Sequence, residues 1–414
     1  MTRNANQKQA GNRPKVVRIL GRLTGGPARQ ASLLHNKLAE HFETRLITGK
    51  LCAGESEMSH LLESQSNVFR LSEMSREISP WYDVRALWKI VRFLKKERPD
   101  VVHTHAAKSG ALGRLAAWIA GVPVIVHTYH GHIFHGYFSP AKTHMYLAIE
   151  RLLGLVTTRV VVISESQKKE ITSTYRVVPE EKVSVVRNGF ELGKFDGRGR
   201  EEARNQFGFG RDRFVIIWAA RMAPVKDVEL LAQVVRAQAK AKTRACFLVV
   251  GEGEEKCKLE ELVLGCDNVR VVGWQDEMEK VWSAGDAGLL TSRNEGTPTA
   301  LIEAMASGLP FVSTNVGGVR DLAAGPVQEL SDNMGIQAAN GFLTPRKGEA
   351  LSYCVSWLID HPEQAAAMGV AGRAFVAENY QSERLIAELN QLYMSLIQQQ
   401  RRHRRAALEV KGTT

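Results

Sequence analysis

Short apolar runs alternate along the chain with longer segments in which apolar residues recur every three or four positions. Most short runs are continuously apolar, as in Val122–Val126 and Phe214–Ala219, which is typical of strands buried on both faces of a parallel sheet. The longer segments, such as Gln30–His41 and Val228–Lys240, have the spacing of amphipathic helices. The alternation predicts a doubly wound α/β architecture.

The pattern predicts eleven strands, and their ranges share β-branched or continuously apolar sequence: Val16–Leu20, Thr44–Thr48, Val101–Thr104, Val122–Val126, Val160–Ile163, Val183–Val186, Phe214–Ala219, Cys246–Val250, Val269–Val272, Gly288–Thr291 and Pro310–Ser313. Further helices are predicted over Val84–Lys96, Gly110–Ala120 and Ala300–Ser307. The series pauses at residues 188–213, which are rich in glycine and charge, as a linker is.

Two domains are expected because a single core stops growing at roughly 250–300 residues, and the chain has 414. We place them at residues 1–196 and 197–383. A last helical stretch, Ser382–Gln400, continues into the basic run Arg401–Arg405, which is typical of a solvated, frayed helix end.

Composition narrows the class of protein. Apolar residues make up 44% of the chain, which is enough to bury a core and excludes general disorder. Five cysteines without a Cys-x-x-Cys pair argue against a disulfide framework or structural zinc. The polar start is no secretory signal, and no apolar run approaches the roughly 20 residues that span a bilayer. We therefore expect a cytoplasmic protein that is not integral to a membrane.

The net charge of +11 is unevenly distributed. Residues 1–196 contain 29 Lys and Arg against 17 Asp and Glu, whereas residues 197–414 contain 26 against 27. A positive excess suits nucleic acid, an anionic membrane surface or phosphorylated small molecules. No nucleic-acid motif is recognisable. The asymmetry therefore favours peripheral docking on the inner face of the cell membrane, or a phosphorylated lipid acceptor.

Two glycine-rich turns follow predicted strands. Gly25-Gly26 precedes a helix whose free N–H groups could meet a phosphate, although a plain strand-to-helix turn explains the pair equally well. Gly251-Glu252-Gly253 lacks the third glycine of a dinucleotide fingerprint, and its acidic neighbours would repel a pyrophosphate. We interpret the second turn as structural.

A histidine-rich segment follows the fourth predicted strand. It contains His127, His130, His132 and His135, and it is preceded along the chain by His103 and His105. Metal binding is one interpretation, since imidazole is a common ligand. No Asp-x-Asp or His-Glu-x-x-His accompanies the cluster, and His130 follows a buried strand, where α/β sheets place their ligands. We favour a hydrogen-bonding or electrostatic role for His130, and we expect no metal site.

Two further segments carry charge at predicted strand ends. Arg221 and Lys226 could close on one diphosphate, or could be solvated loop charges. In residues 293–318, Glu295 ends a strand and Glu303 lies on the following helix. The residues that could bind phosphate or sugar oxygens at this helix start are Gly296, Thr297, Pro298 and Thr299. The alternative is that Glu295 caps a helix dipole and Glu303 is solvated.

Taken together, residues 15–400 resemble the retaining glycosyltransferases of family four. Glu295 and Glu303 match the E-x7-E motif of that family, and Arg221 and Lys226 match its Arg-x4-Lys pair. The other matches are the glycine loop Gly25-Gly26, His130, Asn188-Gly189 at the interdomain junction, and the closing helices. The segments around His103 and His130 are similar to members that act in bacterial surface-polysaccharide assembly.

This resemblance implies the GT-B fold, with two Rossmann-like domains facing a central cleft and a C-terminal helix, about residues 384–414, packed on the first domain. It also implies metal-independent transfer of a sugar, with retention, from a nucleoside diphosphate sugar that we expect to be UDP-linked. Arg221 and Lys226 would stabilise the leaving diphosphate, Glu303 would hold ribose hydroxyls, Glu295 would hold the sugar, and His130 would place sugar and acceptor.

The acceptor implied by the resemblance is a lipid-linked or glycan intermediate. Two departures from the family pattern stand beside the cations: Trp218-Ala219-Ala220 where a glycine usually precedes the arginine, and Asp227 where glycine often follows the lysine. Three alternatives stay open: a nucleotide-sugar epimerase or hydrolase of the same fold, a basic nucleic-acid-binding protein, and a catalytically silent assembly partner.

Overall fold

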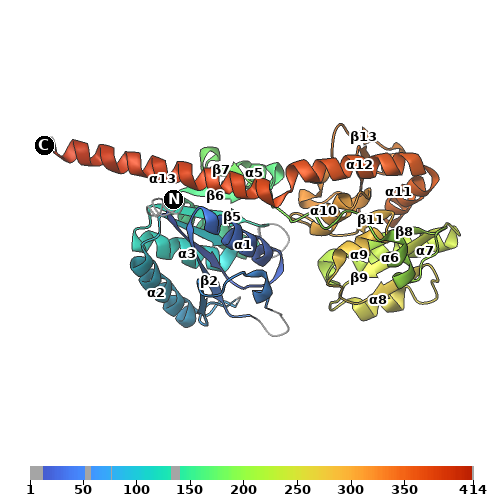
Figure 1. Cartoon of the computed structure of the whole chain (residues 1–414), viewed down its shortest axis with the longest axis horizontal. Helices are drawn as coiled ribbons and strands as arrows, with labels where there is room; N and C mark the ends of the chain where they lie inside the picture. The colour runs from blue at the N-terminus through green and yellow to red at the C-terminus, as the bar shows by residue number, and fades with distance from the viewer. Residues whose placement is uncertain (1–12, 52–56, 76, 132–139, 413–414) are drawn as a thin grey trace, which may run out of the picture. The chain divides into compact units, whose positions relative to one another are not determined.

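The structure is a computed structural model that describes residues 13–51, 57–75, 77–131 and 140–412. The chain forms two compact units (Figure 1). Unit 1 comprises Met1–Gly189 together with Ser382–Thr414, and unit 2 comprises Phe190–Gln381. Each unit is built from one sheet with helices on both of its faces, as the alternation of apolar runs predicts.

Unit 1 contains a seven-stranded parallel sheet in the order β3-β2-β1-β4-β5-β6-β7. In chain order the strands are β1 (Lys15–Leu20), β2 (Glu43–Gly49), β3 (Val68–Leu71), β4 (Val101–His105), β5 (Val124–Tyr129), β6 (Arg159–Val162) and β7 (Val183–Val185). The strand order reverses between β1 and β4. In open α/β sheets such a switch point is where ligands bind, at the carboxyl ends of the strands.

The helices of unit 1 form one layer on each face of its sheet. One layer contains α2 (Pro80–Glu97), α3 (Ala107–Ala120) and α4 (Pro140–Val156), and the other contains α1 (Gly25–Lys37) and α13 (Ser382–Gly412). A short helix, α5 (Glu165–Lys169), follows β6. Along β5, Val124 and Val126 pack in the cluster that contains α13, whereas Ile125 packs with α2 and α3. Because successive side chains of a strand point to opposite faces of the sheet, β5 contributes to the cores on both faces.

Helix α13 buries one apolar stripe on unit 1. Its buried side chains recur at helical spacing and are Leu385, Leu389, Tyr393, Leu396 and Ile397. The helix runs on to Gly412, beyond the predicted Gln400, and Arg401–Arg405 are exposed on it.

Unit 2 contains an eight-stranded sheet in the order β10-β9-β8-β11-β12-β15-β14-β13, in which β13 and β14 are antiparallel to their neighbours. Its strands are β8 (Phe214–Ala219), β9 (Ala245–Val250), β10 (Val269–Val272), β11 (Ala287–Leu290), β12 (Phe311–Thr314), β13 (Gln328–Glu329), β14 (Ile336–Ala338) and β15 (Gly341–Thr344). Here the order reverses between β8 and β11.

One face of this sheet packs against α7 (Val228–Lys240), α8 (Lys256–Leu262) and α11 (Gly348–Asp360). The other packs against α6 (Arg200–Phe207), α9 (Met278–Ser283) and α10 (Thr299–Ala306). Helix α12 (Pro362–Asn379) contributes Met368 to the first core and Val376 to the second.

The structure differs from the sequence-based expectation at three places. The change of unit falls at Gly189, not at residue 196, because the Phe190 N–H donates to the carbonyl of Tyr380 and Phe195 lies in the core of unit 2. The expected linker contains α6, whose buried Arg204 pairs with Asp286. The apolar pattern also missed β3, β13, β14 and β15.

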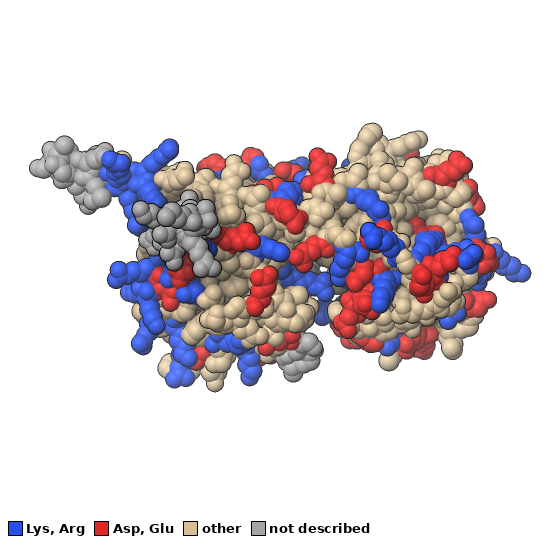
Figure 2. Space-filling model, viewed as in Figure 1, with Lys and Arg blue, Asp and Glu red and all other residues tan. Residues whose placement is uncertain are grey.

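Charge is distributed differently over the two units. On the face drawn in Figure 2, Lys and Arg side chains gather over α2 and the last turns of α13, whereas unit 2 carries acidic and basic side chains in mixture. Among the described residues, no helix combines the length and the apolar character that crossing a bilayer would require.

Candidate active site

An ion pair joins two loops of unit 2 at its switch point. Strand β8 leads to a 3₁₀ turn, Pro224–Lys226, and the neighbouring strand β11 leads to the loop that carries Glu295. Lys226 Nζ lies 2.5 Å from Glu295 Oε1, and the Ser292 hydroxyl donates to the same oxygen at 2.5 Å. The two strands are parallel neighbours, so their carboxyl ends bring these residues together.

A chain of two side-chain hydrogen bonds holds the backbone of Lys226 in place. The Thr291 hydroxyl donates to the carbonyl of Lys226 at 2.7 Å, and the indole N–H of Trp218 donates to the Thr291 hydroxyl oxygen at 2.9 Å. Trp218 and Thr291 are fully buried. Trp218, which departs from the glycine-rich family pattern, therefore holds the chain that positions the lysine.

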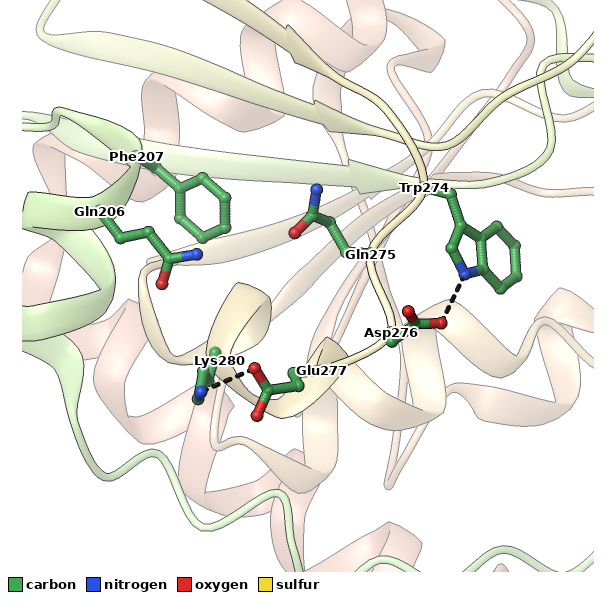
Figure 3. A pocket seen from close by; sticks show the side chains of 7 residues that line it. All are labelled: Gln206, Phe207, Trp274, Gln275, Asp276, Glu277 and Lys280. Carbon is green, nitrogen blue, oxygen red and sulfur yellow. Dashed lines mark hydrogen bonds and ion pairs between the residues drawn. The ribbon is translucent and has the colours of Figure 1, made fainter. Parts of the chain in front are cut away.

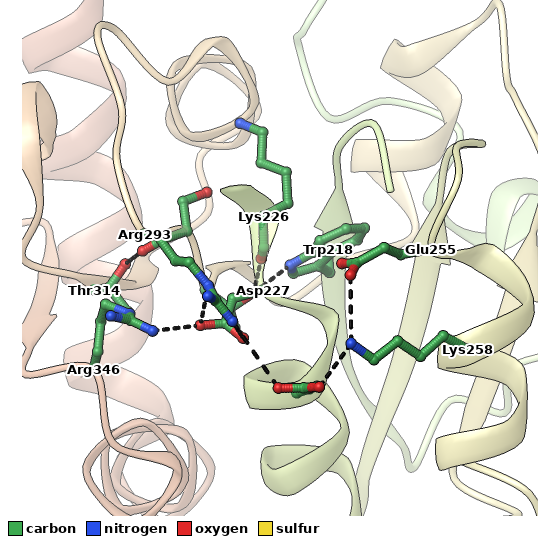
Figure 4. Close-up of polar contacts among 11 residues, drawn as sticks. Trp218, Lys226, Asp227, Glu255, Lys258, Arg293, Thr314 and Arg346 are labelled. Atoms are coloured by element: carbon green, nitrogen blue, oxygen red, sulfur yellow. Dashed lines mark hydrogen bonds and ion pairs between the residues drawn. The ribbon is translucent and has the colours of Figure 1, made fainter. Parts of the chain in front are cut away.

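Asp227, the second departure, anchors three loops of unit 2 (Figure 4). Its carboxylate pairs with Arg346 at 2.8 Å and with Arg293 at 3.2 Å, and the Arg293 N–H donates to the carbonyl of Val225. Burial alone would raise the pKa of the Asp227 carboxyl, but hydrogen bonds from Arg346 and Arg293 lower it. Its φ of 56° lies in the left-handed region that favours glycine. In Figure 4 the Lys226 side chain points away from this cluster.

The Glu295 loop also packs against the loop that follows β12. The Gly318 N–H donates to the Glu295 carbonyl at 3.0 Å. A Cβ atom at Gly318 would lie 1.9 Å from the carbonyl oxygen of Gly296, and one at Gly317 would lie 2.1 Å from that of Glu295. Only glycines permit this close approach of two backbones.

Helix α10 begins at Thr299, with Pro298 at its N-cap and no side chain capping its first turn. The first turn of an α-helix leaves backbone N–H groups without helical acceptors, so it favours an anion. Pro298 is buried, and Gly296, Thr297 and Thr299 are half-buried. The expected phosphate-binding segment thus lies directly after Glu295 in the loop that leads into α10.

Glu303 is buried on α10, so the alternative that it is solvated is wrong. Its Oε2 accepts a hydrogen bond from the indole N–H of Trp282 at 3.0 Å, and Trp282 is fully buried. A buried carboxylate requires such partners. The sequence pattern did not single out Trp282.

Arg221 lies in the loop after β8 and is exposed. Within the described part of the chain, its side chain forms no hydrogen bond or ion pair with Lys226 or Glu295. The structure therefore brings Lys226 and Glu295 together, but it does not bring Arg221 to them.

Three histidines of unit 1, His103, His105 and His130, form a row at the ends of β4 and β5. His105 Nδ1 lies 2.9 Å from His130 Nε2, and the rings of His103 and His105 lie 4.3 Å apart. His103 is hydrogen-bonded on both ring nitrogens, at 2.5 Å to the hydroxyl of Tyr393 and at 2.6 Å to that of Thr128. Helix α13 therefore contacts the histidine row through Tyr393.

Burial lowers the pKa of His130 to about 4, so its imidazole is neutral at pH 7. His127 points elsewhere, with its Nδ1 at 2.8 Å from the Thr104 hydroxyl. His132 and His135 lie outside the described residues. Among the residues that the structure describes, no group of three or more His, Cys, Asp and Glu side chains is arranged to hold a metal ion.

The glycine pair of unit 1 starts α1 after β1. Gly25 has a φ of 75°, which favours glycine, and the preceding Thr24 makes no side-chain cap. A Cβ atom at Gly26 would meet nothing within 4 Å. The uncapped helix start is therefore open beside the switch point of this sheet.

A polar pocket in unit 2 had no signal in the sequence (Figure 3). It lies between the end of α6 and the loop before α9, and its lining residues are Gln206, Phe207, Trp274, Gln275, Asp276, Glu277 and Lys280. The Trp274 indole donates to Asp276 at 2.9 Å, and Lys280 pairs with Glu277 at 2.7 Å. With its lysine already paired, this acidic pocket does not suit a diphosphate.

Comparison with solved structures defines the class of the fold. The structure of Anabaena HepE in complex with UDP and glucose aligns with a TM-score of 0.73 at 18% identity, covering 92% of this chain and 100% of that chain. WaaG, a glycosyltransferase involved in lipopolysaccharide biosynthesis, aligns with a TM-score of 0.67 at 16% identity, covering 91% and 99%. The protein therefore has the GT-B fold.

Sequence comparison gives the family. Residues 25–189 match the glycosyl transferase 4-like domain, and residues 213–361 match glycosyl transferases group 1. The UDP-Gal:alpha-D-GlcNAc-diphosphoundecaprenol alpha-1,3-galactosyltransferase of Escherichia coli is 30% identical over 305 residues, which cover 71% of this chain and 78% of that protein. The capsular polysaccharide biosynthesis glycosyltransferase CapM of Staphylococcus aureus is 23% identical over 83% of this chain and 89% of its own. The chain belongs to glycosyltransferase family four.

Proposed function

We propose that this glycosyltransferase moves a sugar from a UDP-linked donor, with retention of anomeric configuration, to a lipid-linked or glycan acceptor of surface-polysaccharide synthesis. The observation that carries the proposal is the Lys226–Glu295 pair at the switch point of unit 2, just before the uncapped start of α10. The names of the relatives support it, since the Escherichia coli enzyme is named for UDP-Gal and a diphosphoundecaprenol acceptor. HepE was solved with UDP and glucose.

The donor diphosphate would bind between Lys226 and the first turn of α10. Its negative charge would take the place of Glu295 beside the ammonium group, and backbone N–H groups at Thr299 would contribute further donors. Charge grows on the diphosphate as the sugar leaves, so a fixed cation there lowers the barrier. Arg221 would supply a second cation once it turns inward.

The two carboxylates would hold hydroxyl groups. Glu295, released from Lys226 but still held by Ser292, would accept hydrogen bonds from the transferred sugar. Glu303 would hold the ribose, with its orientation fixed by the Trp282 indole. This division places one carboxylate in the loop before α10 and the other on the helix itself.

His130 would place the sugar and the acceptor, and Gly25-Gly26 would let the donor approach the backbone of unit 1. A neutral imidazole can donate or accept a hydrogen bond without adding positive charge to the site. In the route we propose, the acceptor hydroxyl attacks the face from which the diphosphate leaves, and the diphosphate takes the acceptor proton. No covalent intermediate on the enzyme and no metal ion take part.

The test is a panel of nucleoside diphosphate sugars, each incubated with and without a polyprenyl-diphosphate-linked sugar. We expect release of UDP only with the acceptor present, and an NMR spectrum of the product with the donor's anomeric configuration. An inverted product would overturn retention. Release or isomerisation of sugar without transfer would instead support an epimerase or hydrolase.

A further inference from the structure

Helices α2, α3 and α4 form a continuous layer on one side of the unit 1 sheet. Helix α3 lies between the other two, and all three bury their inner sides on β1, β4, β5 and β6. Their outer side chains form what we call the α2–α4 face. This face belongs to the unit that carries the positive excess of the chain.

The outer side of α2 is made only of apolar and basic side chains. Its exposed residues are Trp81, Tyr82, Val84, Arg85, Trp88, Lys89, Arg92, Lys95 and Lys96. Trp81 is 68% exposed and Trp88 57%. The acidic residues of this helix are withdrawn from its surface, since Asp83 pairs with Lys108 and Glu97 with Lys15.

Over their described residues, the surfaces of α3 and α4 also carry large apolar side chains and no exposed acidic ones. Trp118 is exposed on α3, and the exposed large apolar residues of α4 are Met145, Ile149, Leu152 and Leu155. The acidic residue of α4, Glu150, is buried and held by Arg114 and the Tyr129 hydroxyl. Among the described side chains of the three helices, no Asp or Glu is exposed.

This composition is that of a surface that meets an anionic bilayer. Trp and Tyr prefer the headgroup level, where their rings are amphipathic, and Lys and Arg are attracted to anionic lipid. Exposed aromatic and aliphatic groups clustered on one face are unfavourable in water and mark an interaction site. The complete lack of exposed carboxylates on these helices favours an anionic partner over a mixed protein surface.

We propose that the α2–α4 face docks unit 1 on an anionic lipid bilayer, with Trp81 and Trp88 in the headgroup layer. The Asp83–Lys108 pair ties the start of α2 to the start of α3, and α3 begins two residues after His105, the last residue of β4. The aromatic end of α2 therefore lies at the edge of the sheet that carries His105 and His130. The inference rests on the proposed lipid-linked acceptor, which docking would bring to this edge.

The test is flotation of the full chain with vesicles of phosphatidylcholine alone, or with phosphatidylglycerol added. We expect binding only to the anionic vesicles, and loss of it in 0.5 M salt. The triple substitution Arg92→Gln, Lys95→Gln, Lys96→Gln should weaken binding by about fivefold for each charge removed. Trp81→Ala with Trp88→Ala should weaken it about tenfold.

Matched variants in unit 2 control for net charge and for lost apolar area. The control for charge is a triple variant that removes three exposed charges around the end of α7: Arg236→Gln, Lys240→Gln and Lys242→Gln. The control for apolar area is a double variant that removes two exposed apolar side chains: Leu264→Ala and Val370→Ala. Both should leave vesicle binding unchanged. Equal binding to neutral and anionic vesicles, or unchanged binding by the α2 variants, would overturn the proposal.

Two further results would contradict membrane docking by the α2–α4 face, and each would indicate a different contact. If only neutralising Arg402 and Arg404 abolishes binding, the end of α13 is the membrane contact. If the tryptophan variants instead convert a dimer to a monomer in sedimentation, the face is occupied by a second copy of the chain. Transfer to a soluble acceptor analogue should be normal in every α2 variant, so failure of docking can be told apart from failure of the proposed activity.

Discussion

Lys226 Nζ and Glu295 Oε1 form an ion pair that is largely shielded from water, with side chains 22% and 9% exposed. The pair joins the loops that follow β8 and β11 at the switch point of unit 2. A diphosphate that takes the lysine must therefore displace the carboxylate. Binding of the diphosphate to Lys226 would also release Glu295 to accept hydrogen bonds from the sugar. A single binding step would therefore bring both side chains into contact with the donor.

Lys226→Ala tests the diphosphate role. We expect kcat/KM for donor-dependent transfer to fall about 10²- to 10³-fold, because a preorganised cation facing the leaving group is lost. Stability should change far less, since the Ser292 hydroxyl still donates to Glu295. Urea unfolding and a UDP-release assay measure the two effects.

The matched control is Lys258→Ala, which removes another paired lysine of unit 2, the partner of Glu229. It should leave turnover unchanged. Normal turnover in the Lys226 variant would remove the lysine from the mechanism.

Trp282→Phe tests the orientation of Glu303. The substitution keeps an aromatic ring in the core but deletes the N–H that donates to Glu303 Oε2. We expect KM for the donor to rise about tenfold with little change in kcat, because the ribose is bound equally in the ground and transition states. Trp357→Phe, on the opposite face of the sheet, is the control. A fall in kcat with KM unchanged would contradict the assignment.

Asp227→Asn removes both arginine pairs of the loop anchor, and Asp227→Gly also removes the left-handed strain. We expect the asparagine variant to lose about 1–3 kcal/mol of unfolding free energy, because Arg293 and Arg346 lose their buried partner. The glycine variant should recover about 1 kcal/mol of that loss. Urea unfolding compares them, with Glu229→Gln as the exposed control. Equal stability of the wild type and the asparagine variant would show that the pairs contribute nothing.

The sequence predicted the two-unit α/β architecture and the acidic and basic residues of the candidate site, because continuous apolar runs and strand-end charges follow directly from burial in a parallel sheet. It could not predict Asp227 pairing with Arg346, which are far apart in the chain and meet only through loop geometry. The sequence pattern missed edge strand β3 because the strand is only four residues long and Arg70 interrupts its apolar run. The sequence did not indicate the contact between Tyr393 and His103, because that contact forms only when α13 packs on unit 1.

Addition of EDTA should leave the transfer rate unchanged. Both ring nitrogens of His103 are engaged, by Tyr393 and Thr128, and His105 and His130 are bonded to each other. At His103, a metal ion would have to break one of these two hydrogen bonds to take a ring-nitrogen lone pair. Strong inhibition by the chelator, relieved by one particular divalent ion, would reinstate the histidines as metal ligands. A dialysed sample that keeps its full rate would agree with our expectation.

Stability should fall as the pH falls from about 6.5 to 4, because buried imidazoles gain protons only on unfolding. Burial, followed by the charges of Arg18 and Arg45, lowers the pKa of His35 to about 4, whereas an unfolded histidine has a pKa of about 6.5. The folded pKa is the lower one, so the contribution is present above 6.5 and is lost through this window. It amounts to about 1.4 kcal/mol per pH unit, or about 3 kcal/mol in total for His35.

The pKa values of His103, His105 and His127 are lowered well below the usual value, mainly by burial, so they act in the same direction. Urea midpoints at pH 7, 6 and 5 should therefore decline, and His35→Gln should flatten the decline by removing one of these protons. His41→Gln, at an exposed histidine of the same unit, should leave the slope as it is. A wild-type profile that is flat from pH 7 to 5 would contradict the prediction, because it would mean that these imidazoles bind as many protons in the folded chain as in the unfolded chain.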